Sequence, residues 1–230
     1  YFRMGQQQEA RRERDLLAQM PQQETSDDPY VAEVIQLRQD PNWIATRAQT
    51  MFELGQTDRG MAYLEEVIRA HPGRVLFPLE LARALGGSGQ LDQAADLLGR
   101  TIRDHPESSE LRLLEGLVFR ELGRASEAEA SFQAAIERKP DHAEAWLWLG
   151  RTRLDRGQVE QALEAFRHSA RYRPDLPEPH AALGELLLKQ NRASEAVLHL
   201  QTAVDLSPAD DRLRRRLIEA RRAARKKSSG

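Results

Sequence analysis

The chain contains no cysteine, which excludes a disulfide framework, a thiolate zinc site and a cysteine nucleophile. Aromatic residues make up only 6% of the 230 residues, so the core must be built mainly from Leu and Ala. The sequence has no run of about 18 apolar residues and therefore predicts no membrane-spanning helix. Lysine is also scarce, with four Lys against 30 Arg, a bias that fits a bacterial protein from a GC-rich genome.

The N-terminus shows no pattern typical of a secretory signal peptide. The chain begins Tyr1-Phe2-Arg3-Met4, which is not a natural start, so either Met4 is the native initiator or a leading segment has been cut away. The expected localisation is therefore cytoplasmic, or periplasmic behind a removed N-terminal anchor. The absence of cysteine fits both compartments.

The most informative feature present is a repeat with a constant period of 34 residues. The prolines that recur at this spacing are Pro72, Pro106, Pro140, Pro174 and Pro208. The glycines that recur in step with them are Gly55, Gly89, Gly123 and Gly157, with Asn191 in the fifth place. A fixed period of about 20–50 residues indicates a repeat architecture, and 34 is typical of a helix–turn–helix unit.

Each unit is predicted to contain two helices joined by a turn. The five units span residues 41–74, 75–108, 109–142, 143–176 and 177–210. The recurring Gly falls after the first helix, where a left-handed conformation would clash with a side chain. Asn is the best non-Gly residue for such a position. Pro closes the unit because it cannot continue a helix interior.

Two further sets of columns predict how the helices pack. Small residues lie where the two helices of a unit must approach closely, and large residues fill the space between neighbours. The small residues of the first helices are Ala48, Ala82, Gly116, Gly150 and Gly184. The large residues of the second helices are Leu64, Leu98, Phe132, Phe166 and Leu200.

The two ends of the chain lie outside the repeat. Residues 1–40 form an N-terminal extension, with expected helices at 6–20 and 31–37 and a polar linker at 21–29. Residues 211–224 predict one more helix, whose apolar stripe of Leu213, Leu217 and Ala220 would cover the last unit. Residues 211–230 form a basic capping helix and tail that holds nine bases and two acids, a net charge of +7.

With these columns in place, the sequence resembles the tetratricopeptide repeat, whose signature is W-x2-L-G-x2-Y, then A-x3-F, then P. The matching residues of the fourth unit are Trp146, Leu149, Gly150, Ala162, Phe166 and Pro174. The resemblance covers residues 41–210, and the first unit is the most degenerate. It implies an all-α fold, a right-handed helical-repeat solenoid of five helix–turn–helix units followed by the capping helix.

The resemblance also implies a function, because the first helices of such units line a concave groove that binds a peptide or protein partner. Carried over column by column, the expected groove residues are Leu79, Arg83, Leu113, Leu117, Arg120, Leu147, Trp148, Arg151 and Leu154. An amphipathic helix or an extended peptide would suit an apolar strip edged by charges. The alternative is that these leucines simply pack against neighbouring helices.

Other classes of function find little support in the sequence. No nucleophile, base and acid form an arguable catalytic set, and no phosphate-binding loop is present, so an enzyme, a cofactor and a small-molecule substrate are not expected. His142, His168, His180 and His199 share no column, which argues against a metal site. An alternative function is recruitment to nucleic acid or an anionic membrane by the basic helix. Without an interleaved aromatic residue to stack on bases, DNA is not the expected partner.

Overall fold

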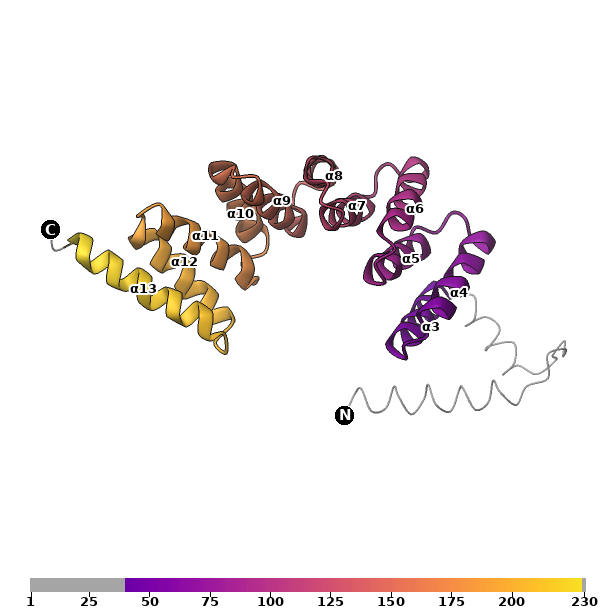
Figure 1. Cartoon of the computed structure of the whole chain (residues 1–230), viewed down its shortest axis with the longest axis horizontal. Coiled ribbons are helices and arrows are strands. Elements are labelled where there is room, and N and C mark those ends of the chain that lie inside the picture. Colours follow the sequence, from indigo (N-terminus) through magenta and orange to yellow (C-terminus); the bar gives the residue numbers. More distant parts are fainter. Residues whose placement is uncertain (1–39, 229–230) are drawn as a thin grey trace. The chain divides into compact units, whose positions relative to one another are not determined.

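The computed structural model describes residues 40–228, within which eleven helices and no strands occur. The predicted helices at 6–20 and 31–37 and the linker at 21–29 lie outside the described residues. The helices are α3 (Pro41–Glu53), α4 (Thr57–Ala70), α5 (Leu76–Gly87), α6 (Leu91–Asp104), α7 (Ser109–Glu121), α8 (Ala125–Arg138), α9 (Ala143–Asp155), α10 (Val159–Tyr172), α11 (Pro177–Lys189), α12 (Ala193–Leu206) and α13 (Asp211–Ser228) (Figure 1).

The chain divides into two compact units within α3, between Arg47 and Ala48. In the first unit, the backbone N–H of Asn42 donates to Asp40 Oδ1 at 2.7 Å and so satisfies a free donor at the start of α3. The Arg47 guanidinium lies 5.2 Å from the centre of the Trp43 ring. The second unit, residues 48–230, contains the end of α3 and all helices from α4 onward.

From α4 to α13, each helix packs against the next one along the chain. The turn between the two helices of a unit has the predicted conformation, since Gly55, Gly89, Gly123 and Gly157 all have φ between 72° and 80°. Asn191 has φ 58° and is the single non-Gly residue of positive φ among the described residues. The fold is therefore an all-α helical-repeat solenoid, with one helix pair in each predicted unit.

The small and large columns meet inside the third, fourth and fifth units, as the sequence predicts. A Cβ atom placed on Gly150 would lie 2.6 Å from the Phe166 ring, which is fully buried. The same relation holds between Gly116 and Phe132, at 2.5 Å. The ring of the second helix thus fills the space that the missing side chain of the first helix leaves open.

Polar contacts at fixed places add to this packing. The Trp146 indole N–H donates to the Pro140 carbonyl at 2.8 Å and so ties the start of α9 to the loop before it. The buried Ser169 hydroxyl on α10 donates to the Ala143 carbonyl on α9, also at 2.8 Å. These contacts fix the first turn of α9 against the preceding loop and against α10.

Helix α13 closes the array and runs to Ser228, four residues beyond the predicted end. The predicted stripe is buried, with Leu213 at 2%, Leu217 at 5% and Ala220 at 0% exposure. Leu217 and Ala220 join the core of α10, α11 and α12. The charged residues of α13 consequently face outward.

Candidate functional site

The predicted groove residues lie on the first helices α5, α7 and α9, but their leucines are mostly covered. Leu79, Leu113 and Leu147 are only 9%, 8% and 7% exposed. Leu113 and Leu147 belong to two neighbouring core clusters, so these two side chains contribute to the packing between helices. Leu117 and Leu154 are half-buried and pack on the edges of the same clusters.

Two of the predicted groove arginines stack on the ring of one tryptophan. The guanidinium of Arg120 on α7 lies 4.8 Å from the centre of the Trp148 ring, and that of Arg151 lies 4.6 Å from it. Cation–π contacts of this kind stabilise by about 0.5–2 kcal/mol, depending on how far they are removed from water. The stack spans two repeats, since Arg120 comes from the third unit and Trp148 from the fourth.

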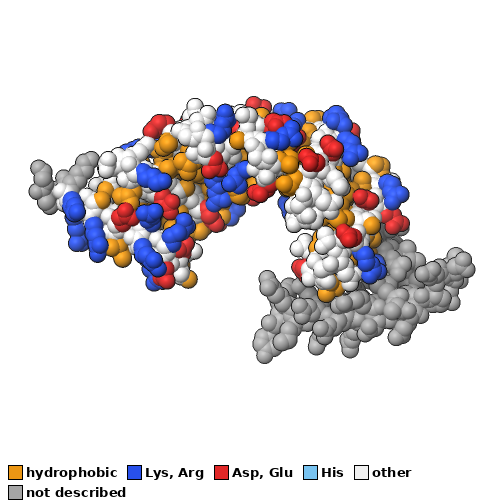
Figure 2. Space-filling model, viewed as in Figure 1, with side chains coloured by type: hydrophobic (Ala, Val, Ile, Leu, Met, Phe, Trp, Pro, Cys, Tyr) orange, Lys and Arg blue, Asp and Glu red, His pale blue; other side chains and the backbone are white. Residues whose placement is uncertain are grey.

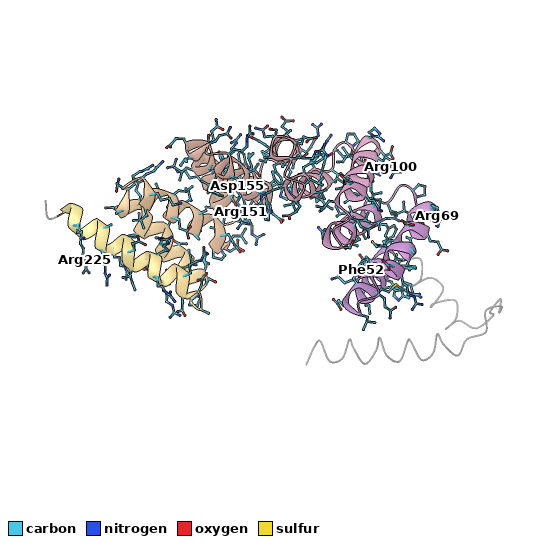
Figure 3. All side chains as sticks on the ribbon, in the orientation of Figure 1. Phe52, Arg69, Arg100, Arg151, Asp155 and Arg225 are labelled. Carbon is cyan, nitrogen blue, oxygen red and sulfur yellow. The ribbon has the colours of Figure 1, made fainter. Side chains whose placement is uncertain are left out.

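The two arginines of the stack are incompletely satisfied. Arg120 has carboxylates nearby, Asp155 at 3.6 Å and Glu121 at 3.9 Å, but its Nε is buried and has no hydrogen-bond acceptor. Arg151 forms neither an ion pair nor a hydrogen bond with the described residues and lies against the Trp148 ring. Burial lowers the pKa of Arg151, and the charge of Arg120 lowers it further against the weaker opposing pull of Glu178 and Asp155. Asp155 lies four residues after Arg151 and therefore on the same face of α9 (both are labelled in Figure 3).

A cleft of about 660 Å3 adjoins this stack. It is lined by Lys139, Asp141, His142, Ala143, Glu144, Leu147, Trp148, Arg151, Tyr172, Arg173, Leu176 and Glu178. Three Lys and Arg residues line the cleft, and two of them have partners. Arg173 donates twice to Asp175 at 2.8 Å, and Lys139 lies 4.0 Å from Glu110. Arg151 is therefore the basic group of the cleft with a free guanidinium edge. We call Arg120, Trp148, Arg151 and this cleft the Trp148 site.

His142 contributes a neutral polar wall to the cleft. Burial lowers its pKa, with a further contribution from Lys139 that outweighs the opposing pull of Glu110, and so favours the neutral imidazole. Its Nε2 is buried and has no hydrogen-bond partner among the described residues. A buried polar atom without a partner is uncommon in folded proteins, and this residue lines the same cleft as Arg151.

A buried acidic residue holds the helices behind the site in place. Glu129 on α8 is 8% exposed and accepts a hydrogen bond from Arg153 Nε at 2.9 Å and another from Arg156. Arg153 lies in the last turn of α9 and Arg156 directly follows the helix, so the contact joins the third and fourth units. Nearby, Glu115 accepts from Arg112 at 3.1 Å and from the Ser131 hydroxyl at 2.8 Å. The Glu129 contacts hold α9, and with it Trp148, against α8, and the contact of Glu115 with Ser131 joins α7 to α8.

The structure thus brings together Arg120, Leu147, Trp148 and Arg151 of the predicted set, with Leu117 on an adjoining cluster. Arg83 lies apart from them and pairs with Glu80 on its own helix at 3.5 Å. The contact between Arg120 and Trp148 could not be foreseen from the sequence, because the two residues come from different units and from different columns, whereas Trp148 and Arg151 are three residues apart on one helix, a spacing that brings side chains together. The spacing of 28 residues between Arg120 and Trp148 carries no signal at the period of 34.

One pair of histidines was also missed. His180 on α11 and His199 on α12 share no column, yet their Nδ1 atoms lie 3.3 Å apart. His180 occupies the column that Trp146 holds in the preceding unit, and the second helix of its own unit brings His199 to it. Across residues 40–228, no group of three or more His, Asp or Glu side chains is arranged to hold a metal ion. Within the same range, no helix combines the length and the apolar character needed to cross a membrane.

Comparison with known proteins places these features in a family. Models of the tetratricopeptide repeat match residues 47–73, 79–140, 113–177 and 153–215, most of the chain. No curated protein matches the sequence. The solved structures to which the chain is similar share its fold at low sequence identity.

MamA from Desulfovibrio magneticus RS-1 has a TM-score of 0.61 and 19% identity, covering 74% of this chain and 97% of its own. TTC0263, a thermophilic TPR protein of Thermus thermophilus, has a TM-score of 0.60 and 20% identity, with coverages of 79% and 98%. YrrB, described as a TPR protein with an unusual peptide-binding site, has a TM-score of 0.58 and 17% identity, with coverages of 86% and 100%. From the repeat columns, the stacked helix pairs and the family models together, this chain belongs to the tetratricopeptide repeat family.

Proposed function

We propose that this protein is an interaction scaffold that binds an acidic peptide segment of a protein partner at the Trp148 site. It acts as a binding module, not as an enzyme. Membership of the tetratricopeptide repeat family supports the general role. YrrB, a structural neighbour, is itself described as having a peptide-binding site. The observation that carries the proposal is the Arg120–Trp148–Arg151 stack beside an open cleft.

The chemistry of the ligand follows from the unsatisfied groups. A half-buried guanidinium without a carboxylate lacks the hydrogen bonds that usually compensate for lost hydration. A carboxylate of the peptide, placed at Arg151, would supply them and reduce the repulsion between Arg151 and Arg120. An apolar side chain of the same peptide would lie on the exposed part of Trp148 and on Leu176. Aromatic and Arg side chains are the groups that most often dominate the binding energy of an interface.

The test is a selection of random peptides on the full chain, followed by fluorescence anisotropy of the best binders. We expect these peptides to share an acidic and an apolar residue. Trp148→Ala should weaken their binding by about tenfold or more, as loss of an interface anchor does. Arg151→Glu should have an effect of similar size and should also reduce the dependence of the affinity on salt.

The matched control is Arg100→Glu, which changes the charge equally at an exposed position on α6 (Figure 3). It should leave the affinity unchanged. Circular dichroism of each variant separates lost binding from lost helix. The proposal is wrong if selected peptides bind the wild type, Trp148→Ala and Arg151→Glu with equal affinity.

A further inference from the structure

The outward surface of α13 carries a second group of charges that the Trp148 site does not use. Residues 211–226 hold eight bases and two acids, and the apolar stripe of the helix is already buried against the array. Figure 2 shows the Lys and Arg side chains gathered along this end of the chain.

Five of these eight bases interact with other residues, Arg225 among them. Arg212 lies 3.3 Å from Glu185 on α11, and Arg216 lies 2.9 Å from Glu219. Arg214 pairs with Asp211, and Arg221 donates to the Gln201 amide oxygen at 2.6 Å. Both acids of the helix are thereby occupied.

Three bases form no ion pair or hydrogen bond with the described residues, and they lie in one row. Arg215, Arg222 and Lys226 are separated by seven and four residues, a spacing that places them on the same helix face. At about 1.5 Å per residue the row is about 16 Å long. Exposed charges in a row repel one another, so an anionic partner would relieve this repulsion.

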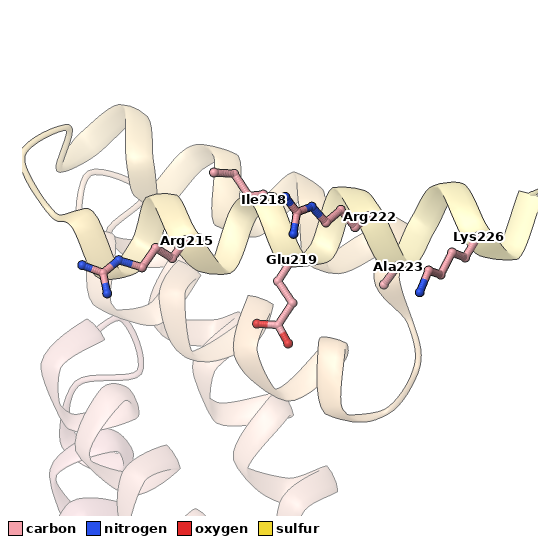
Figure 4. Close-up of a pocket in the computed structure, with 6 residues that line it drawn as sticks. All are labelled: Arg215, Ile218, Glu219, Arg222, Ala223 and Lys226. Atoms are coloured by element: carbon pink, nitrogen blue, oxygen red, sulfur yellow. The ribbon is translucent and has the colours of Figure 1, made fainter.

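An apolar group lies within this row of bases. Ile218 is 49% exposed, unlike the buried Leu217 beside it in the sequence. Ile218 lines a shallow pocket of about 470 Å3, and all of the lining residues belong to α13: Arg215, Ile218, Glu219, Arg222, Ala223 and Lys226. Figure 4 shows Ile218 and Arg222 on the same side of the helix. We call Arg215, Ile218, Arg222 and Lys226 the α13 row.

The composition of the α13 row selects among possible partners. A second copy of α13 would bring like charges together and is excluded by repulsion. A lipid surface would require a free apolar face for insertion, but the apolar stripe of α13 is buried on the array. Nucleic acid would contact the Arg and Lys side chains through its phosphates, and because no aromatic residue is present to stack on nucleobases, it would leave Ile218 unused. A protein segment that carries both acidic and apolar side chains can satisfy all four residues.

We propose that the α13 row is a second docking surface, which binds an acidic amphipathic helix of a protein partner. The Glu or Asp side chains of that helix pair with Arg215, Arg222 and Lys226, and an apolar side chain covers Ile218. This surface is separate from the Trp148 site, so the protein can hold two different segments at once. The linkage of two such contacts is how a scaffold raises the effective concentration of one partner near another.

The probe is a helical peptide with blocked ends, carrying Glu at positions separated by seven and four residues and Leu beside the second Glu. Its binding to the full chain is measured by fluorescence anisotropy over a range of salt concentrations. We expect Ile218→Ser to weaken binding by about tenfold, because the apolar contact is lost while every charge remains. The double variant Arg215→Gln/Arg222→Gln should weaken binding similarly.

The matched control is Arg214→Gln/Arg221→Gln, which removes the same charge from bases that already have partners and should retain the affinity. Because the Trp148 site could also bind this acidic and apolar peptide, the measurement is repeated in the Trp148→Ala background, where Ile218→Ser should weaken the remaining binding by the same factor. Duplex DNA and phosphatidylserine vesicles serve as competing probes. The inference is overturned if Ile218→Ser binds the peptide as well as the wild type does, or if DNA or vesicles bind more tightly than the peptide.

Discussion

The close approach of Gly150 to Phe166 leads to a quantitative prediction for Gly150→Ala. The new Cβ would lie 2.6, 2.8 and 3.0 Å from three atoms of the Phe166 ring. The ring is 0% exposed and is held within the core of α10, α11 and α12, so it cannot move away without disturbing several other side chains. Overpacking of this kind costs about 1–3 kcal/mol.

An opposing effect has to be separated from this cost. Replacing Gly by Ala in a helix interior normally stabilises a protein by about 1 kcal/mol. Gly99 on α6 provides the reference, because a Cβ there would meet nothing within 4 Å. Gly99→Ala should therefore raise the free energy of unfolding by about 1 kcal/mol, and Gly150→Ala should fall about 1–3 kcal/mol below that variant.

The assay is urea denaturation followed by circular dichroism, with hydrogen exchange to locate the change. Exchange should increase in α9 and α10 and, more weakly, in the neighbouring units, because each unit contacts mainly its neighbours. If Gly150→Ala stabilises the protein as much as Gly99→Ala does, the packing explanation of the small column fails. Uniform loosening from α4 to α13 would instead refute the nearest-neighbour description.

Three further predictions concern the last unit. Burial lowers the pKa of His180 and His199 below the usual 6.5, with His180 and Arg167 adding to the effect at His199 and Glu195 opposing it. The histidines of the unfolded chain therefore bind protons at a higher pH than those of the folded chain, so the free energy of unfolding should decline as the pH falls below about 6.5. Thermal melts over this pH range should show a smaller decline for His180→Trp than for the wild type. Asn191→Gly should raise the melting temperature slightly, because Gly adopts the observed φ of 58° without strain; a lower value would contradict this. Truncation after Ala209 should expose the core that Leu213 and Leu217 cover and cause aggregation, whereas a monomer with unchanged melting would show that α13 is not a cap.

The fold could be predicted from the sequence because its determinants are local and periodic. The positive φ at Gly157 and Asn191 and the fit of Gly150 to Phe166 are each set within one unit. The period of 34 then carries them along the chain. Even the exceptional Asn191 could be assigned, since its column identifies its conformation.

The candidate site was harder to predict because it depends on contacts between units. A column places Leu113 and Leu147 on the first helices, but it does not reveal that neighbouring helices cover them to 8% and 7% exposure. The stack of Arg120 on Trp148 joins residues at unrelated positions in successive units. The pair of His180 and His199 likewise depends on how two helices face each other. Such details lie in the non-repeating residues, for which the period gives no information.

The sequential packing of α4 to α13 also gives the protein a mechanical character. Among the described residues, the substantial contacts of α4 to α13 remain within a unit and its immediate neighbours, so a pulling force along residues 48–228 would meet no long-range clamp there. Helix pairs would detach one after another, and each unit of 34 residues would release at most about 120 Å of extended chain. A partner held at the Trp148 site and another held at the α13 row would then be joined by a compliant linker that yields in steps under load.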